Sequence, residues 1–335
     1  MRKLNLTLLL IALTAPILLT AGDIESFLGR WALFVPDGAA WLEVRDEGSY
    51  IDADLLWYGG SVTPVADVYL DGETLVVTRV HRDVMAKDDD GNATRTQQRT
   101  ELYKFLFYGE QLVGKQISPA RNGVGAKVTT FTGQKIPDLP KAPDLSNVKY
   151  GAPIRLFDGK DMSGWELMGE NSVNGWSVID GAMVNDPVQE KGKPHKHYGN
   201  IRTTNEFEDF NLTLQVNVPK GSNSGIYLRG IYEVQVMDSY GRDLDSHNMG
   251  AIYSRITPSV AAEKPAGEWQ DMDITLCDRH VTVKLNGRTI IDNQPLMGVT
   301  GGAITACEFK PGPIYLQGDH GKVSYRNMVL KPIVK

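Results

Sequence analysis

In its C-terminal half the chain reads Phe210-Asn211-Leu212-Thr213-Leu214-Gln215-Val216-Asn217-Val218. This stretch decides the fold, because apolar side chains occupy every second position, which is the period of a strand with one buried face. A second alternation, Val281, Val283 and Leu285, leads into Asn286-Gly287, a dipeptide typical of a type I′ hairpin turn. We find no convincing amphipathic helix in this region. The sequence therefore predicts an all-β fold whose C-terminal part is a β-sandwich.

The N-terminal half also consists of short β-prone runs. They cover residues 41–44, 55–58, 65–70, 74–80, 101–108 and 111–118. Turn residues such as Asp71-Gly72 separate neighbouring runs, which favours an antiparallel meander. The Gly29-Arg30-Trp31 opening resembles that of lipocalin-like barrels. We expect a smaller antiparallel β domain here.

A proline-rich seam separates the two halves. Residues 137–152 contain Pro137, Pro140 and Pro143, and closely spaced prolines favour extended chain outside a sheet. We therefore expect a semi-rigid linker between an N-terminal domain, residues 23–136, and a C-terminal domain, residues 153–335.

The first 22 residues have the pattern of a secretory signal peptide. A basic start with Arg2 and Lys3 precedes an apolar run over residues 4–19, and small residues end at Gly22. The apolar run is shorter than the roughly 20 residues that a spanning helix needs, and no cysteine follows it for lipidation. We expect the mature protein to be secreted or periplasmic, with no membrane span.

Composition narrows the function classes. The chain has 41 acidic and 35 basic side chains, a net charge of −6, which argues against a nucleic-acid partner. Hydrophobic residues make up 41% of the chain, as in ordinary globular proteins. Two cysteines, Cys277 and Cys307, are too few for a disulfide scaffold or a Cys₄ zinc site.

The strand predicted over residues 231–238 carries the first candidate site. Its alternation places Glu233 and Gln235 on the face opposite its aliphatic side chains, and Arg229 falls on the same face if no bulge intervenes. These three side chains could hold a sugar through planar hydrogen bonds. The residues alone favour a solvated outer face with a cross-strand ion pair over such a site.

Histidines supply the other candidates. His195 and His197 form a His-x-His pair in a polar loop, which fits either a metal site or plain solvent exposure. His320 lies at a glycine-flanked turn close to Gln317, where Asp319 could hold its imidazole as a proton carrier near neutral pH.

One further segment makes a family resemblance specific. It reads Leu156-Phe157-Asp158-Gly159-Lys160-Asp161-Met162-Ser163-Gly164-Trp165. This segment resembles the opening of the 3-keto-disaccharide hydrolase domain family. Five further segments agree with that family in type and order: 221–230, 232–240, 250–253, 267–269 and 312–327. The resemblance covers residues 153–333 and implies a concanavalin-like jelly roll that cleaves 3-keto-glucosides outside the cytoplasm.

The resemblance also implies roles for individual residues. Glu233, Gln235 and Gln317 would lie on a concave sugar-binding face. Aromatic candidates for stacking on the sugar are Trp165, Trp176, Tyr227 and Tyr253. Cys277 and Cys307 could pair in an oxidising compartment, which fits export.

A ketone at C3 makes the C2 hydrogen acidic, so a base can remove it and the resulting enolate can expel the C1 substituent. Glu233 or His320 is the candidate base, and Arg229 or a divalent cation the candidate oxyanion stabiliser. The ligand candidates for such a cation are Asp238, His195 and His197. Elimination ranks above double displacement, because Gln235 occupies the place of a second carboxylate.

Two other functions fit the same sequence. Sandwiches of this shape are often carbohydrate-binding proteins without activity, and fold does not settle function. Alternatively, the N-terminal barrel could carry the ligand and the sandwich could be its docking partner.

Overall fold

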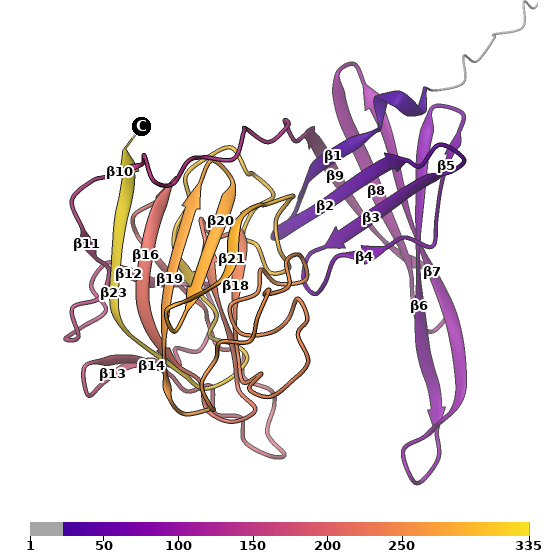
Figure 1. Cartoon of the computed structure of the whole chain (residues 1–335). Helices are drawn as coiled ribbons and strands as arrows, with labels where there is room; N and C mark the ends of the chain where they lie inside the picture. Colours follow the sequence, from indigo (N-terminus) through magenta and orange to yellow (C-terminus); the bar gives the residue numbers. More distant parts are fainter. Residues whose placement is uncertain (1–22, 335) are drawn as a thin grey trace, which may run out of the picture.

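The structure, a computed structural model, describes residues 23–334. The predicted signal peptide lies outside these residues. Within them the fold is all-β: an N-terminal sheet is followed by a C-terminal sandwich (Figure 1). The predicted fold class is therefore confirmed. No helix among the described residues has the length and apolar character needed to cross a membrane.

The N-terminal part is one antiparallel sheet of nine strands in the order β4-β3-β2-β1-β9-β8-β7-β6-β5. A 3₁₀ helix, Ile24–Ser26, precedes it. The strands are β1 Gly29–Val35, β2 Gly38–Asp46, β3 Ile51–Trp57, β4 Thr63–Pro64, β5 Asp67–Asp71, β6 Thr74–Lys87, β7 Ala93–Tyr108, β8 Gln111–Pro119 and β9 Ala126–Lys135. The sheet curls into a half-barrel, and β4 and β5 are its edges rather than partners in a closed lipocalin-like barrel.

The core of the half-barrel lies on the inner side of the curl. Leu75, Val77, Tyr103 and Phe105 are completely buried there. They alternate along β6 and β7, as expected for strands with one buried face. Beyond this core the β6–β7 hairpin continues away from the rest of the molecule (Figure 1).

The C-terminal part packs two sheets face to face. The larger sheet has the order β13-β14-β23-β16-β19-β20-β21, with β10 and β11 also paired to β23, and the smaller has the order β12-β15-β22-β17-β18. The first strands are β10 Lys149–Tyr150, β11 Ile154–Arg155, β12 Trp165–Leu167, β13 Trp176–Ile179, β14 Ala182–Asn185, β15 Ile201–Thr203 and β16 Phe210–Asn217. The remaining strands are β17 Asn223–Leu228, β18 Tyr232–Met237, β19 Trp269–Cys277, β20 His280–Leu285, β21 Arg288–Pro295, β22 Tyr315–Leu316 and β23 Val323–Val334.

The stretch that predicted the sandwich behaves as expected. Phe210, Leu212, Leu214 and Val216 are buried in the core between the sheets. The turn at Asn286-Gly287 joins β20 to β21, and both residues have positive φ, 50° and 80°, as a type I′ turn requires.

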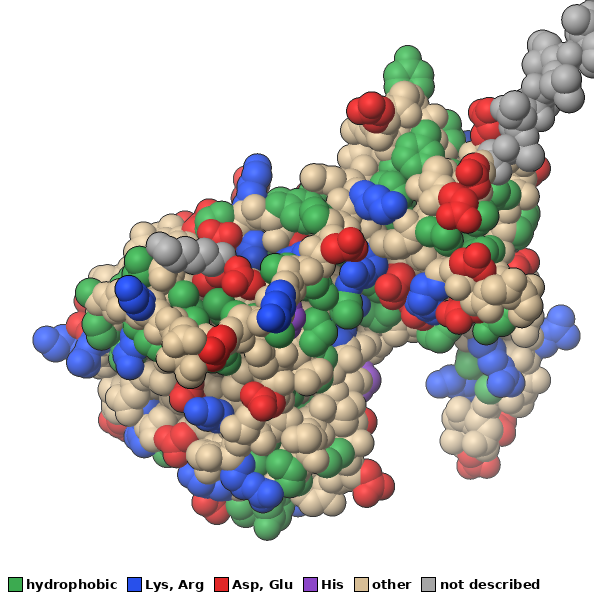
Figure 2. Space-filling view, turned by 45° about the horizontal axis from the view of Figure 1, so that its top comes forward, with side chains coloured by type: hydrophobic (Ala, Val, Ile, Leu, Met, Phe, Trp, Pro, Cys, Tyr) green, Lys and Arg blue, Asp and Glu red, His purple; other side chains and the backbone are tan. Residues whose placement is uncertain are grey.

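The N-terminal sheet contacts the sandwich directly. The loop over residues 58–62 joins β3 to β4. It is held by a hydrogen bond between Ser61 Oγ and His247 Nε2, 3.0 Å, and by one from Val62 N to Ser254 Oγ, 3.0 Å. The Arg255 guanidinium stacks over the ring of Trp41 at 4.2 Å. Figure 2 shows the two parts in contact, with acidic and basic side chains interspersed over both.

The chain between the two parts runs along the sandwich. Asn293 Nδ2 donates to the carbonyl of Pro143, and Arg279 donates to the carbonyls of Pro137 and Asp138. Residues 136–148 contain no strand, as prolines predict. The division into domains at these boundaries stays a prediction.

Candidate functional site

A polar pocket of about 300 Å³ opens on the smaller sheet of the sandwich. Its lining residues are Gly59, Gly60, Asn200, Asn223, Tyr227, Glu233, Tyr253, Gly301, Gly302, Tyr315, Gln317, Asp319 and His320. We call it the sandwich pocket. Of the residues that the sequence singled out, it brings together Glu233, Tyr227, Tyr253, Gln317 and His320.

Strand alternation positions Glu233 in this pocket. Val234 and Val236 of β18 are buried in the core between the sheets, so Glu233 points to the other side. Across the ladder it faces Tyr227 of β17, and its neighbour Gly225 leaves the space that its carboxyl group fills: a Cβ at Gly225 would lie 2.3 Å from Glu233 Oε1. The carboxyl group is therefore held in place with only 3% of the residue exposed.

Burial dominates the electrostatics of Glu233. It raises the pKa of the carboxyl to about 8, although the hydrogen bond from Tyr227 and the charge of His320 act in the opposite direction. The Tyr227 hydroxyl lies 2.8 Å from Glu233 Oε2 and also 2.8 Å from the carbonyl of Gly301. A hydroxyl has one proton, so when it donates to Gly301 the carboxyl must itself be the donor, which suits a protonated Glu233. The pocket therefore contains a carboxyl group that titrates near neutral pH.

His320 and Asp319 form the second titratable group. His320 Nδ1 lies 2.7 Å from Asp319 Oδ1, which agrees with the interaction that the sequence predicted. This hydrogen bond raises the pKa of the His320 imidazole against the effect of partial burial. Burial on its own would raise the pKa of Asp319, but the bond to His320 outweighs it, and the net shift is downward. The pair favours a positively charged imidazole at the pocket wall.

Two amide side chains of the lining have unused acceptors. Asn223 Oδ1 and Gln317 Oε1 are buried, and neither has a hydrogen-bond partner among the residues that the structure describes. Buried polar atoms normally have a partner, so these oxygens are suited to hydroxyl groups of a ligand. The sequence pointed to Gln317 but missed Asn223, which is the first residue of β17.

The tyrosines of the pocket are packed against one another. Tyr227 stacks on Tyr315, with ring centroids 4.0 Å apart and planes at 13°. The face of Tyr227 is thus covered, and its hydroxyl, not its ring, is what it offers to the pocket. Tyr253 is half-buried and packs edge-on against His247, so it remains a candidate for sugar contact. The sequence did not point to Tyr315, because its contact with Tyr227 forms only when β22 pairs with β17.

Gln235 contacts the Glu233 carboxyl group from a buried position next to the pocket. It is 2% exposed and is not part of the pocket lining. With its amide nitrogen turned toward the carboxyl, it donates to Glu233 Oε1 at 3.2 Å and to the carbonyl of Ser224 at 3.1 Å. Its shared face with Glu233 agrees with the alternation, but the structure gives it a supporting position, not a direct contact with a ligand in the pocket.

The expected place of Arg229 is wrong. Its φ of 55° puts it in a left-handed turn between β17 and β18, so strand alternation does not extend to it. The guanidinium is buried, and it donates to the carbonyls of Glu308 and Lys310. These bonds hold the guanidinium outside the pocket lining, so the structure does not place Arg229 beside Glu233 as predicted.

The two tryptophans predicted to bind sugar lie outside the sandwich pocket. Trp165 Nε1 donates to the carbonyl of Leu156, and its ring packs on the core. Trp176 is 4% exposed, and its Nε1 donates to the carbonyl of Gly199. Neither lines the sandwich pocket.

The predicted metal ligands do not come together. Asp238 accepts a hydrogen bond from the backbone of Gly221, while His195 and His197 lie in an exposed loop with ring centroids 5.2 Å apart. The three residues do not form a group of ligand atoms within 4.8 Å of one another. Cys307 has a free thiol, so the described structure contains no disulfide between it and Cys277.

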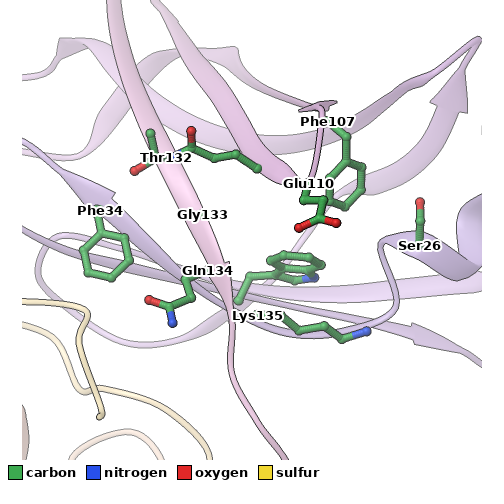
Figure 3. A pocket seen from close by; sticks show the side chains of 10 residues that line it. Ser26, Phe34, Phe107, Glu110, Thr132, Gly133, Gln134 and Lys135 are labelled. Atoms are coloured by element: carbon green, nitrogen blue, oxygen red, sulfur yellow. The ribbon is translucent and has the colours of Figure 1, made fainter. Parts of the chain in front are cut away.

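A second hollow, of about 690 Å³, lies on the N-terminal sheet. Figure 3 shows Phe34, Phe107, Glu110 and Lys135 around it. Among its described lining side chains none has a buried polar atom without a partner. Its lining is mixed, with aromatic rings beside the charged Glu110 and Lys135, whereas the candidate acid–base groups Glu233 and His320 lie in the sandwich pocket. That the N-terminal part carries the ligand stays a prediction.

Comparisons with known proteins concern mainly the C-terminal part of the chain. Residues 152–331 match the model of the 3-keto-alpha-glucoside-1,2-lyase-like domain. A 3-keto-disaccharide hydrolase from Bacteroides thetaiotaomicron is 25% identical over 167 residues, which cover 42% of this chain and 57% of that protein.

Two solved structures of candidate glycosyl hydrolases from Parabacteroides distasonis are also similar. One has 29% identity and covers 59% of this chain and 94% of its own, with a TM-score of 0.44. The other has 21% identity and covers 54% and 94%, also with a TM-score of 0.44. On the family match over more than half of its length, the chain belongs to the 3-keto-alpha-glucoside-1,2-lyase-like domain family.

Proposed function

We propose that this protein cleaves 3-keto-glucosides in the sandwich pocket by elimination across C1 and C2. The observation that carries the proposal is the buried Glu233 carboxyl, with its pKa raised to about 8, in one pocket with the His320–Asp319 pair. A carboxylate of raised pKa is a stronger base than an exposed one, as removal of a proton from carbon requires. The family match and the named activity of the Bacteroides relative support the same chemistry.

In the proposed reaction the ionised Glu233 removes the C2 proton, and the electrons of the C–H bond form an enolate with the C3 oxygen. The enolate then expels the C1 substituent. The leaving oxygen takes its proton from the His320 imidazolium, whose charged form Asp319 favours. The products are a 1,2-unsaturated 3-keto sugar and a free alcohol or sugar, and addition of water to the double bond completes a net hydrolysis. Asn223 and Gln317 accept hydrogen bonds from sugar hydroxyl groups.

Incubation with a 3-keto-glucoside tests the proposal, with the unoxidised glucoside as the matched substrate. We expect release of the leaving group from the first and none from the second, because the C2 proton is acidic only beside the ketone. Exchange of the C2 hydrogen for deuterium from D₂O would support proton abstraction. Equal cleavage of both substrates would contradict elimination, and binding without cleavage would indicate a carbohydrate-binding protein instead.

We also propose that the chain is exported, to the periplasm or outside the cell, which the pattern of residues 1–22 supports. Detection of the mature N-terminus near Asp23 in the exported fraction would test this.

A further inference from the structure

The N-terminal half-barrel reaches into the sandwich pocket although it lies outside the family match. Gly59 and Gly60, from the loop between β3 and β4, line the pocket together with Glu233 and His320. The matched region begins only at residue 152. These glycines therefore form a pocket wall that comes from the N-terminal half-barrel and lies outside the residues that the family model matches.

This loop is fixed in its position. Besides the contacts of Ser61 and Val62 with His247 and Ser254, Gly302 N donates to the carbonyl of Tyr58 at 3.1 Å. The approach between the two parts is close: a Cβ at Gly301 would lie 2.1 Å from the carbonyl oxygen of Gly60. Such contacts from both sides make the loop a rigid wall rather than a passing neighbour.

The wall also adjoins the groups that set the chemistry. Gly301, which the loop covers, accepts a hydrogen bond from Tyr227, and the same hydroxyl contacts Glu233. At about 300 Å³ the pocket is at the lower end of the 300 to 1,000 Å³ of typical ligand pockets, so any atoms on its rim restrict what fits. We propose that the 58–62 loop determines substrate size, by limiting the group attached to the 3-keto sugar. This inference rests on the proposed function.

Gly59 offers the cleanest test. Its φ is not in the left-handed range, and a Cβ there would meet nothing within 4 Å, so a side chain can be added without backbone strain. In Gly59→Trp the added indole would reduce the space at the wall. We expect KM for a 3-keto-disaccharide to rise at least 10-fold and KM for methyl 3-keto-glucoside to change less than 3-fold. Gly59→Leu should give an intermediate ratio.

Ser49→Trp is the matched control. Ser49 is exposed in the turn before β3, at the other end of the same strand, so the same side chain is added away from the pocket. Both KM values should remain those of the wild type. Unfolding temperatures of all variants verify that they are folded. An unchanged ratio of the two KM values in folded Gly59→Trp and Gly59→Leu would overturn the proposal.

A binding experiment separates this inference from the proposed function. Calorimetric titration of Glu233→Gln, with and without Gly59→Trp, measures the affinity for both ligands without turnover. If Gly59→Trp weakens binding of the larger ligand more than binding of the smaller one, the wall is supported. This holds even if the wild type cleaves neither substrate, since that result would refute only the proposed reaction. Equal affinities in both variants would refute the wall even if cleavage occurs.

Discussion

Two buried glutamates of this protein have similar neighbours and opposite acidities. Glu101 of β7 accepts hydrogen bonds from Tyr103 at 2.8 Å, from Ser118 at 2.6 Å and from Arg99 at 3.1 Å, and His81 lies 3.1 Å away. Burial alone would raise its pKa, but these donors outweigh burial and bring the pKa to about 2. Glu101 is therefore ionised throughout the neutral range.

Glu233 has a tyrosine partner and a nearby histidine as well. In its case burial prevails and raises the pKa to about 8, because Tyr227 shares its proton with Gly301 and the other donor is the neutral amide of Gln235. A carboxylate bonded to a guanidinium and two hydroxyls therefore stays ionised, whereas a deeply buried carboxyl with only neutral donors becomes a candidate base.

The largest expected effect comes from replacing the base. Glu233→Gln keeps the shape of the side chain and removes its basicity, so kcat on a 3-keto-glucoside should fall by about 10³-fold. Steady-state kinetics measure this, and Glu101→Gln is the matched control, since the same change in the half-barrel should leave kcat as in the wild type. Full activity in Glu233→Gln would break the distinction between the two glutamates.

Replacing the acid should have the next largest effect. His320→Gln removes the group that protonates the leaving oxygen, so we expect about a 10²-fold lower kcat for an alkyl leaving group. A nitrophenyl leaving group needs no proton, and its loss should be less than 10-fold. The measurement is kcat of the wild type and of His320→Gln with each of the two leaving groups. Equal losses for both would instead assign His320 the role of base.

The two glutamates should also change stability with pH in opposite directions. Protonated Glu233 stabilises the fold below about pH 4.5, and this contribution is lost as the pH rises through about 8. Ionised Glu101 stabilises the fold above about pH 4.5, and this contribution is lost as the pH falls toward about 2. Relative to Glu233→Gln, the wild type should lose about 2 to 4 kcal/mol of unfolding free energy between pH 5 and pH 8.

Denaturant titrations at several pH values measure these slopes. Glu101→Gln should show the reverse behaviour, with a deficit at neutral pH that shrinks as the pH falls from about 4.5 toward about 2. Parallel curves for the wild type and Glu233→Gln would show that burial does not raise the pKa of Glu233.

The smallest effect is expected from a binding amide. Asn223→Ala removes a buried oxygen that has no partner among the described residues, so the protein should remain as stable as the wild type. KM should rise about 5- to 10-fold, the value of one hydrogen bond of roughly 1 kcal/mol. Asn185 is the contrasting case, because its Nδ2 donates to the carbonyls of Gly318 and Gly321. Asn185→Ala removes these hydrogen bonds and should therefore lower the unfolding temperature.

Strands, turns and the faces of individual strands could be predicted from the sequence, because they depend on short-range periodicity. The alternation at 210–218, the Asn286-Gly287 turn and the common face of Glu233 and Gln235 follow from the pleat of a strand, which each segment imposes on its own side chains. The pairing of Asp319 with His320 likewise links adjacent residues.

Other features depend on how distant segments pack. Arg229 leaves the predicted face because two consecutive left-handed residues, Arg229 and Gly230, turn the chain between β17 and β18. The indole nitrogens of Trp165 and Trp176 donate to backbone carbonyls elsewhere in the sandwich. The ionised state of Glu101 depends on Ser118 and His81 from neighbouring strands as well as on Arg99 and Tyr103 of its own strand, and the 58–62 loop reaches the pocket from another sheet. Burial and contacts between strands far apart in the sequence set these features, and a local pattern does not record such contacts.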